Sequence, residues 1–90
     1  MKKLEGKVAI VTGGAMGNGL GIVRVFLEYG AKVAILDYSD KLISTLEDFK
    51  KKGYNVLGYT VDIRDFEKVK NAVDDIYSKF GKIDILVNNA

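Results

Sequence analysis

The chain has 90 residues, 48% of them hydrophobic and 29% charged, so it fits one ordinary globular domain and excludes a disordered chain. Its formal net charge of +2 gives no electrostatic reason to expect binding to nucleic acid or to a membrane surface. The sequence contains no cysteine and no histidine, which excludes disulfides, thiolate chemistry and the commonest zinc ligand. It shows no export signal or membrane-spanning run, so we expect a cytoplasmic protein.

The first element is a strand that leads into a glycine-rich turn. Residues 8–11 are four consecutive apolar residues, too short for a helix and rich in β-branched side chains, so they are typical of a strand buried on both faces of a parallel sheet. Gly13, Gly17 and Gly19 follow at the spacing G-x-x-x-G-x-G. The apolar period then becomes helical, which predicts a helix over residues 17–29 that is closed by Gly30.

The glycine-rich turn is placed where the first helix begins. Backbone N–H groups in the first turn of a helix have no intrahelical partner, and the helix dipole adds positive charge there, so phosphate is the natural occupant. Glycines allow the backbone to approach a pyrophosphate, adopt positive φ and pack the helix close to the strand. The turn therefore predicts a phosphate site, with a purely structural turn as the alternative.

Downstream, strand and helix patterns alternate. Residues 7–10 recur at residues 32–35, and this offset of 25 residues matches one strand-helix unit. Further strands are expected over residues 32–36, 55–60 and 83–87. Four strands alternating with three helices predict right-handed parallel βαβ units. The fold class is thus α/β, the first half of a Rossmann-type doubly wound sheet with strand order 3-2-1-4, formed by residues 1–90 as one truncated dinucleotide-binding domain.

The two downstream helices carry boundary signals of their own. Ser39 or Asp40 is expected to cap the second helix, which ends in a solvated lysine run before Gly53. Asp65 is expected to cap the third helix and Gly81 to end it. One face of the second helix should carry Leu42, Ile43, Leu46 and Phe49. The third helix has an apolar stripe that we expect in the core: Phe66, Val69, Ala72, Val73, Ile76, Tyr77 and Phe80.

Asp37 follows the second strand, 18 residues after Gly19. A dinucleotide site places a carboxylate there to accept hydrogen bonds from the adenosine ribose hydroxyls. The carboxylate would repel a 2′-phosphate, and no basic residue follows until Lys41, so NAD is favoured over NADP. Tyr38 beside it and Met16 in the glycine-rich turn are further cofactor-binding candidates. The alternative is that Asp37 is a turn residue that caps the second helix.

Two more polar positions fall at the same edge of the expected sheet. Asp62 could accept a hydrogen bond from the exocyclic amine of adenine while Ile63 flanks the ring, although a simple turn or cap residue explains Asp62 nearly as well. Asn88 and Asn89, after the fourth strand, could line the cofactor cleft or form a plain polar turn. Ligands of such sheets bind beyond the carboxyl ends of the strands, where all these segments converge.

Together, these motifs resemble the amino-terminal half of the short-chain dehydrogenase/reductase family over essentially all 90 residues. The resemblance rests on residues 12–19, Asp37, Asp62-Ile63 and Asn88-Asn89-Ala90. It implies the NAD-binding portion of an oxidoreductase that moves hydride between NAD and an alcohol or ketone. By resemblance, the pyrophosphate lies on Gly13, Gly17 and Gly19, the ribose on Asp37 and the adenine on Asp62 and Ile63, and Asn89 and Ala90 line the cleft.

The sequence departs from the family pattern in two places. Asn18 stands where the family usually has an apolar residue, and its side chain could bond a phosphate or disturb packing under the helix. The family's serine and Tyr-x-x-x-Lys pair lie beyond the end of this chain, so we expect the chain alone to be inactive. A non-enzymatic nucleotide-binding module and a self-associating half-fold with an empty turn are the alternatives.

The last strand is expected to lack a neighbour on its outer side. Ile83, Ile85, Leu86 and Val87 would then present an unpaired apolar edge. We therefore expect self-association through residues 83–88, either strand against strand or by exchange of helices between two copies.

Overall fold

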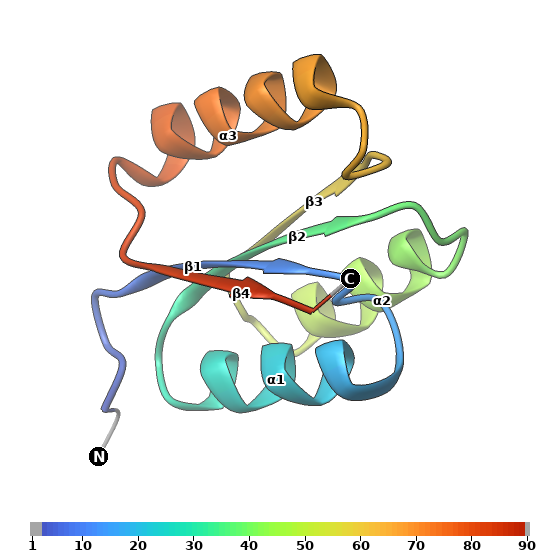
Figure 1. Ribbon diagram of the computed structural model, residues 1–90. Helices are drawn as coiled ribbons and strands as arrows, with labels where there is room; N and C mark the ends of the chain where they lie inside the picture. The colour runs from blue at the N-terminus through green and yellow to red at the C-terminus, as the bar shows by residue number, and fades with distance from the viewer. Residues whose placement is uncertain (1–2, 90) are drawn as a thin grey trace.

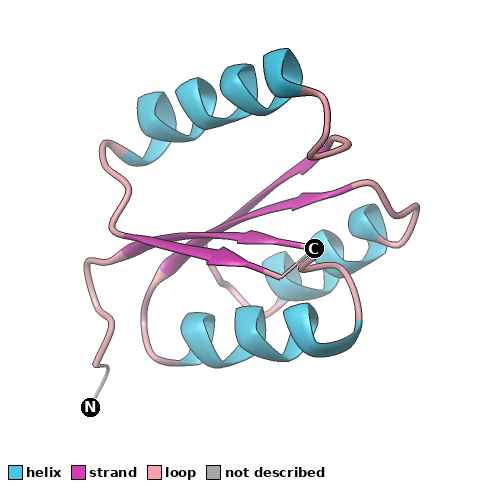
Figure 2. Cartoon of the chain, viewed as in Figure 1, coloured by secondary structure: helices cyan, strands magenta, loops and turns pink. Residues whose placement is uncertain are grey.

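The computed structural model describes residues 3–89 as an open parallel sheet between two helical layers (Figure 1). In chain order, the elements are β1 (Val8–Thr12), α1 (Gly17–Glu28), β2 (Lys32–Asp37), α2 (Leu42–Lys51), β3 (Val56–Thr60), α3 (Phe66–Phe80) and β4 (Ile85–Asn88). Helices α1 and α2 cover one face of the sheet and α3 covers the other (Figure 2). None of these helices is long and apolar enough to cross a bilayer.

The sheet has the order β3-β2-β1-β4, and every pair of neighbours is parallel. The predicted fold class and strand order are therefore confirmed. Strand β1 is buried along its whole length, as its unbroken apolar run requires of a strand with a helix layer on each side. Strands β3 and β4 form the two edges of the sheet.

The core is divided by the sheet into two parts. On the side of α1 and α2, the buried side chains include Val11 of β1, Ile35 of β2 and Phe49 of α2. On the side of α3, Ile10 and Leu36 pack with Ile76. Successive residues of β1 and β2 thus alternate between the two parts, since side chains along a strand point to opposite faces.

The predicted boundaries of α3 are confirmed, whereas the predicted cap of α2 is wrong. The side chain of Asp65 accepts a hydrogen bond from the backbone N–H of Lys68, and Gly81 ends α3 in the left-handed conformation. Helix α2 begins only after Lys41 and has no side-chain cap. Ser39 lies one turn earlier, where its hydroxyl oxygen accepts from the N–H of Lys41 at 3.1 Å.

Three apolar residues predicted to be buried are exposed. Phe66 and Tyr77 of α3 are 78% and 60% exposed, and Ile43 of α2 is 66% exposed. In α3, the buried stripe is narrower than the sequence pattern, because a single helix covers this part of the sheet within the described residues and its flanking positions meet solvent. In α2, Ile43 lies about 100° around the helix from buried Leu42.

Strand β4 begins at Ile85, two residues later than predicted. Asp84 explains the difference, because its carboxylate accepts a hydrogen bond from the N–H of Val8 while its own N–H donates to the carbonyl of Val8, both at 2.9 Å. This side-chain contact takes the place of a regular ladder pair. Ile83 lies before it and packs on the core beneath α3.

Candidate functional site

All four strands end at the same edge of the sheet, where α1 begins. Figure 1 shows the strand arrows pointing to the right of the view, toward the amino end of α1. Gly13, in the turn after β1, and Gly17, the first residue of α1, have φ angles of 69° and 62°, which favour glycine. Among residues 3–89, no side chain caps the start of α1, and its first turn holds no acidic residue. The helix end therefore offers backbone N–H groups and positive partial charge to an anion.

Gly19 allows the first turn of α1 to pack directly on the glycine-rich turn. A Cβ atom at this position would overlap the carbonyl oxygen of Gly13 and lie 2.7 Å from Nδ2 of Asn89. The close approach of two backbone segments therefore requires a residue without a side chain here. Gly19 thus brings the first turn of α1, whose N–H groups lack intrahelical partners, against the turn that begins at Gly13.

Asp37, the last residue of β2, reaches across to the glycine-rich turn. One carboxylate oxygen accepts from the N–H of Ala15 and the other from the N–H of Ser39, each at 2.9 Å. The side chain thus points toward the mouth of α1 and holds the turn in place. A carboxylate has about four acceptor positions, so each oxygen can still accept from a ribose hydroxyl.

Thr45 on α2 also holds the glycine-rich turn, and the sequence reasoning did not identify it. Its hydroxyl donates to the carbonyl oxygen of Ala15 at 3.1 Å, and Thr45 is buried. The available signal was a hydroxyl residue at helical spacing between the apolar Leu42 and Phe49. The two backbone groups of Ala15 are therefore both bonded to side chains, one from β2 and one from α2.

Replacing Thr45 by valine should lower the free energy of unfolding by about 2 kcal/mol, because it leaves a buried carbonyl oxygen without its donor. The Thr45→Ser variant keeps the hydroxyl and should lose less. Urea denaturation of both variants measures the difference. A Thr45→Val variant as stable as the native chain would show that the hydrogen bond to Ala15 does not contribute to stability.

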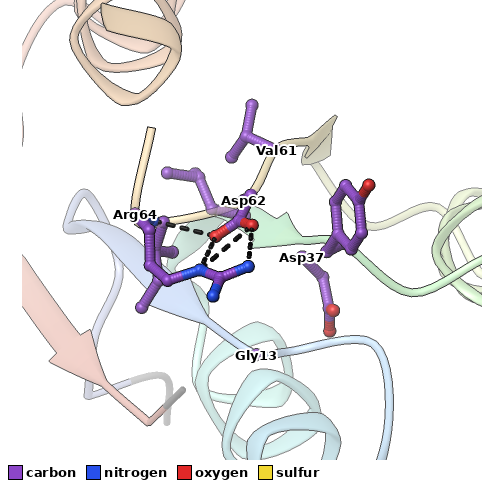
Figure 3. A pocket seen from close by; sticks show the side chains of 8 residues that line it. Gly13, Asp37, Val61, Asp62 and Arg64 are labelled. Carbon is purple, nitrogen blue, oxygen red and sulfur yellow. Dashed lines mark hydrogen bonds and ion pairs between the residues drawn. The ribbon is translucent and has the colours of Figure 1, made fainter. Parts of the chain in front are cut away.

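A pocket of about 220 Å³ opens beside the glycine-rich turn and brings five of the predicted residues together. It is lined by Gly13, Leu36, Asp37, Tyr38, Val61, Asp62, Ile63 and Arg64. In Figure 3, Asp62 and Arg64 lie on one side of this pocket, Asp37 on the other and Gly13 below them. Acidic, aromatic and aliphatic groups thus converge from β1, β2 and the loop after β3.

Asp62 and Arg64 form an ion pair at the rim of this pocket. Nη2 of Arg64 lies 2.7 Å from Oδ2 of Asp62, and Nε lies 3.0 Å from Oδ1. The backbone N–H of Arg64 also donates to Oδ1 at 2.9 Å. The hydrogen bonds from the Arg64 side chain lower the pKa of Asp62 to about 2. Arg64 was not among the predicted site residues, because the pairing depends on the tight turn that brings the two side chains together.

The end of β4 is tied to the glycine-rich turn by side chains. The N–H of Asn89 donates to the hydroxyl oxygen of Thr12 at 2.9 Å, and Nδ2 of Asn89 donates to the carbonyl of Gly13 at 3.3 Å. The hydroxyl of Thr12 lies 3.3 Å from Oδ1 of Asn88. Asn88 and Asn89 therefore support the turn as well as lying at its edge.

The remaining predicted residues lie outside the Asp37 pocket. Gly17, Asn18 and Asn89 line a second, more open hollow beside α1, together with apolar residues such as Ile22. Met16 is exposed, and its sulfur lies 3.7 Å from the hydroxyl of Ser39. Ala90 lies outside the described residues. Five of the predicted residues thus line the Asp37 pocket and three line the second hollow, while Met16 and Gly19 line neither of them.

Comparison with known proteins places this geometry in one family. A family model described as short chain dehydrogenase matches residues 7–90. The chain is 46% identical over 88 residues to the short chain dehydrogenase/reductase dpchG of Colletotrichum higginsianum, covering 97% of this chain and 33% of that protein. It is 47% identical over 88 residues to a cis-2,3-dihydrobiphenyl-2,3-diol dehydrogenase of Pseudomonas putida, covering 98% of this chain and 31% of that protein.

Comparison with solved structures points to the same family. Carveol dehydrogenase from Mycobacterium avium in complex with NAD superposes with a TM-score of 0.92 at 29% identity, over 100% of this chain and 37% of that chain. A short chain dehydrogenase from Mycobacterium smegmatis superposes with a TM-score of 0.91 at 34% identity, over 100% of this chain and 38% of that chain. The chain spans about a third of the length of the curated relatives it matches. Because the family model covers almost all of its residues, the chain belongs to the short-chain dehydrogenase family.

Proposed function

We propose that this chain forms the NAD-binding portion of an oxidoreductase. The observation that carries the proposal is the uncapped start of α1, packed on the glycine-rich turn through Gly19, with the Asp37 carboxylate beside it. An anion at the helix start and a sugar within reach of the acid match two neighbouring parts of an adenine dinucleotide, the pyrophosphate and the adenosine ribose. The similar carveol dehydrogenase was solved in complex with NAD, which supports the same ligand here.

Each part of the nucleotide has candidate partners among the described residues. We assign the pyrophosphate to the backbone of Gly13, Gly17 and Gly19, with Asn18 at the same helix end. Asp37 accepts hydrogen bonds from the ribose hydroxyls. Tyr38 and Ile63 flank the adenine, and the exocyclic amine of the adenine donates to Asp62. Met16 and Asn89 complete the set among the described residues, and Ala90 is proposed from the sequence alone. When bound, NAD would supply the hydride acceptor, while these residues bind and orient it.

We also propose that NAD is preferred over NADP. Asp37 would face the 2′ position of the ribose, and a phosphate there would meet its negative charge. Arg64 brings one positive charge to the same pocket, but its guanidinium is paired with Asp62. With two carboxylates, Asp37 and Asp62, against one guanidinium, the charged side chains of the pocket keep a net negative charge toward a 2′-phosphate.

Calorimetric titration of the chain with NAD, ADP-ribose and AMP tests the proposed function. We expect saturable but weak binding of all three, with ADP-ribose and AMP nearly as tight as NAD, because the assigned contacts are to adenosine and pyrophosphate. Nicotinamide mononucleotide lacks the adenosine and should bind more weakly. Absence of heat with every adenine nucleotide would reject the proposal.

Hydride transfer belongs to the proposal for the whole protein. None of the five tyrosines in the chain has a lysine four residues later, which is the spacing that the family uses for proton exchange. We therefore expect the 90-residue chain to bind NAD without oxidising alcohols. Alcohol-dependent formation of NADH by the purified chain above background would contradict this expectation.

A second proposal concerns the edge of the sheet at β4. Leu86 is 66% exposed, and it borders an apolar hollow of about 380 Å³ that is also lined by Val69, Val73 and Ile83. An edge strand with exposed apolar side chains favours pairing with another chain. We propose that two copies associate through this edge.

The Leu86→Lys variant should shift the chain toward the monomer at micromolar concentration, because it places a charge on the apolar edge. Sedimentation equilibrium of the native chain and the variant measures the shift. The Ile43→Lys variant changes a similarly exposed residue on α2 and should leave the molecular mass unchanged. A native chain that is already a clean monomer would exclude self-association.

A further inference from the structure

Arg64 reaches the Asp37 pocket from the loop between β3 and α3. Its side chain is 88% exposed, yet it lines the same pocket as Asp37 and Tyr38. Figure 3 shows its guanidinium in front of the Asp62 carboxylate, on the side that faces the turn at Gly13. An exposed cationic side chain thus lies against the acid to which the proposed function assigns the adenine amine.

Three N–H groups of Arg64 occupy most of the acceptor positions of Asp62. Oδ1 accepts from the backbone N–H of Arg64 and from Nε, and Oδ2 accepts from Nη2 at 2.7 Å and from Nε at 3.2 Å. A carboxylate offers about four acceptor positions. Because the N–H of Nε is shared between the two oxygens, three N–H groups of Arg64 face about four positions, and an exocyclic amine must compete with the guanidinium for the rest of the carboxylate.

The backbone contact would survive the loss of the Arg64 side chain. The N–H of residue 64 donates to Oδ1 of Asp62 at 2.9 Å whatever side chain residue 64 carries, provided that it is not proline. Asp62 would then stay in place while Oδ2 became free. Replacing the Arg64 side chain therefore tests whether the guanidinium competes with a ligand for Asp62, because the backbone contact still positions the carboxylate.

We infer that Arg64 is a specificity-determining residue of the base subsite, an assignment that rests on the proposed function. Its guanidinium competes with the 6-amino group of adenine for Asp62. It also supplies N–H donors, which suit the O6 and N7 acceptors of a 6-oxo purine. With Arg64 present, the base subsite offers Asp62 as a hydrogen-bond acceptor and Arg64 as a donor. It therefore discriminates poorly between 6-amino and 6-oxo purines. Without the side chain, it presents the acceptor alone and favours adenine.

Calorimetric titration with AMP and inosine monophosphate tests this assignment, because the two nucleotides differ in the group at position 6 of the base. In the Arg64→Ala variant, we expect the ratio of the Kd for inosine monophosphate to the Kd for AMP to rise by about two- to fivefold, the range for an exposed ion pair. Arg64→Lys keeps the charge without the forked pairing and should give an intermediate ratio. Arg24→Ala removes an exposed arginine of α1 and should leave the ratio unchanged.

The outcomes separate this inference from the proposed function. If AMP binds the native chain and Arg64→Ala leaves the ratio unchanged or lowers it, the role of Arg64 is wrong and the nucleotide site stands. If neither nucleotide binds the native chain, both are wrong. The difference between the native chain and Arg64→Ala should also shrink as salt is raised, because salt screens an exposed ion pair.

Discussion

Replacing Gly19 by alanine should lower the free energy of unfolding by about 3 kcal/mol and weaken NAD binding by about a hundredfold. The added Cβ would overlap the carbonyl oxygen of Gly13, which belongs to the backbone and cannot rotate away as a side chain can. Either the turn or the start of α1 must move. The backbone N–H groups proposed to bind the pyrophosphate would then no longer point at the same position. Each lost hydrogen bond to a charged group costs about 1.5–3 kcal/mol.

Gly21 offers a matched control in the same helix. A Cβ there meets no atom within 4 Å, so the Gly21→Ala variant should keep the affinity for NAD. It should also be more stable by about 1 kcal/mol, because alanine is the better helix former. Urea denaturation and calorimetric titration of both variants make the comparison. Similar behaviour of the two variants would show that the close approach at Gly19 is not what shapes the site.

Replacing Asp37 by alanine should weaken NAD binding about tenfold to a hundredfold, the loss expected for a charge-assisted contact to the ribose. It should also lower the free energy of unfolding by about 2 kcal/mol, because the N–H groups of Ala15 and Ser39 lose their acceptor. The carboxylate thus has a structural role and a proposed ligand-binding role. Calorimetry and urea denaturation measure the two effects separately.

The Asp37→Asn variant distinguishes these two roles. Its side-chain oxygen can still accept from one of the two N–H groups, so it should retain part of the stability that the alanine variant loses. Because its charge is gone, the preference for NAD over NADP should narrow. An affinity for NAD that is the same in the native chain and in both variants would reject the assignment of Asp37 to the ribose.

The order of the strands and the position of the glycine-rich turn could be predicted because their signals are local. The buried run before Gly13 indicates a strand with helices on both faces, and the helical period after Gly19 indicates a crossover. Right-handed connections between parallel strands then leave few arrangements of the sheet. The carboxyl ends of the strands meet at one edge in any of them, so Asp37 and Asp62 were expected near each other.

The exposed residues of α3, the start of β4 and the Arg64–Asp62 ion pair could not be predicted, because they depend on contacts between residues that no local sequence pattern indicates. Phe66 and Tyr77 fit the apolar period of α3, but burial requires a neighbouring layer that the described residues do not place there. Asp84 replaces a strand pair with its side chain, and this depends on where Val8 lies across the sheet. Arg64 reaches Asp62 through one rotamer of a long, exposed side chain. Such contacts follow from packing in three dimensions and not from spacing along the chain.

Amide chemical shifts during a titration with NAD test the central claim most directly, because they report on individual backbone N–H groups. If the pyrophosphate lies at the start of α1, the largest changes should fall on Gly17, Asn18 and Gly19, with smaller ones at Ala15 and Ser39, whose N–H groups share the Asp37 carboxylate. The same titration of Gly19→Ala should move these signals little. If the amide chemical shifts at the start of α1 do not change, or if the largest changes fall on β4, a phosphate site at the amino end of this helix is contradicted.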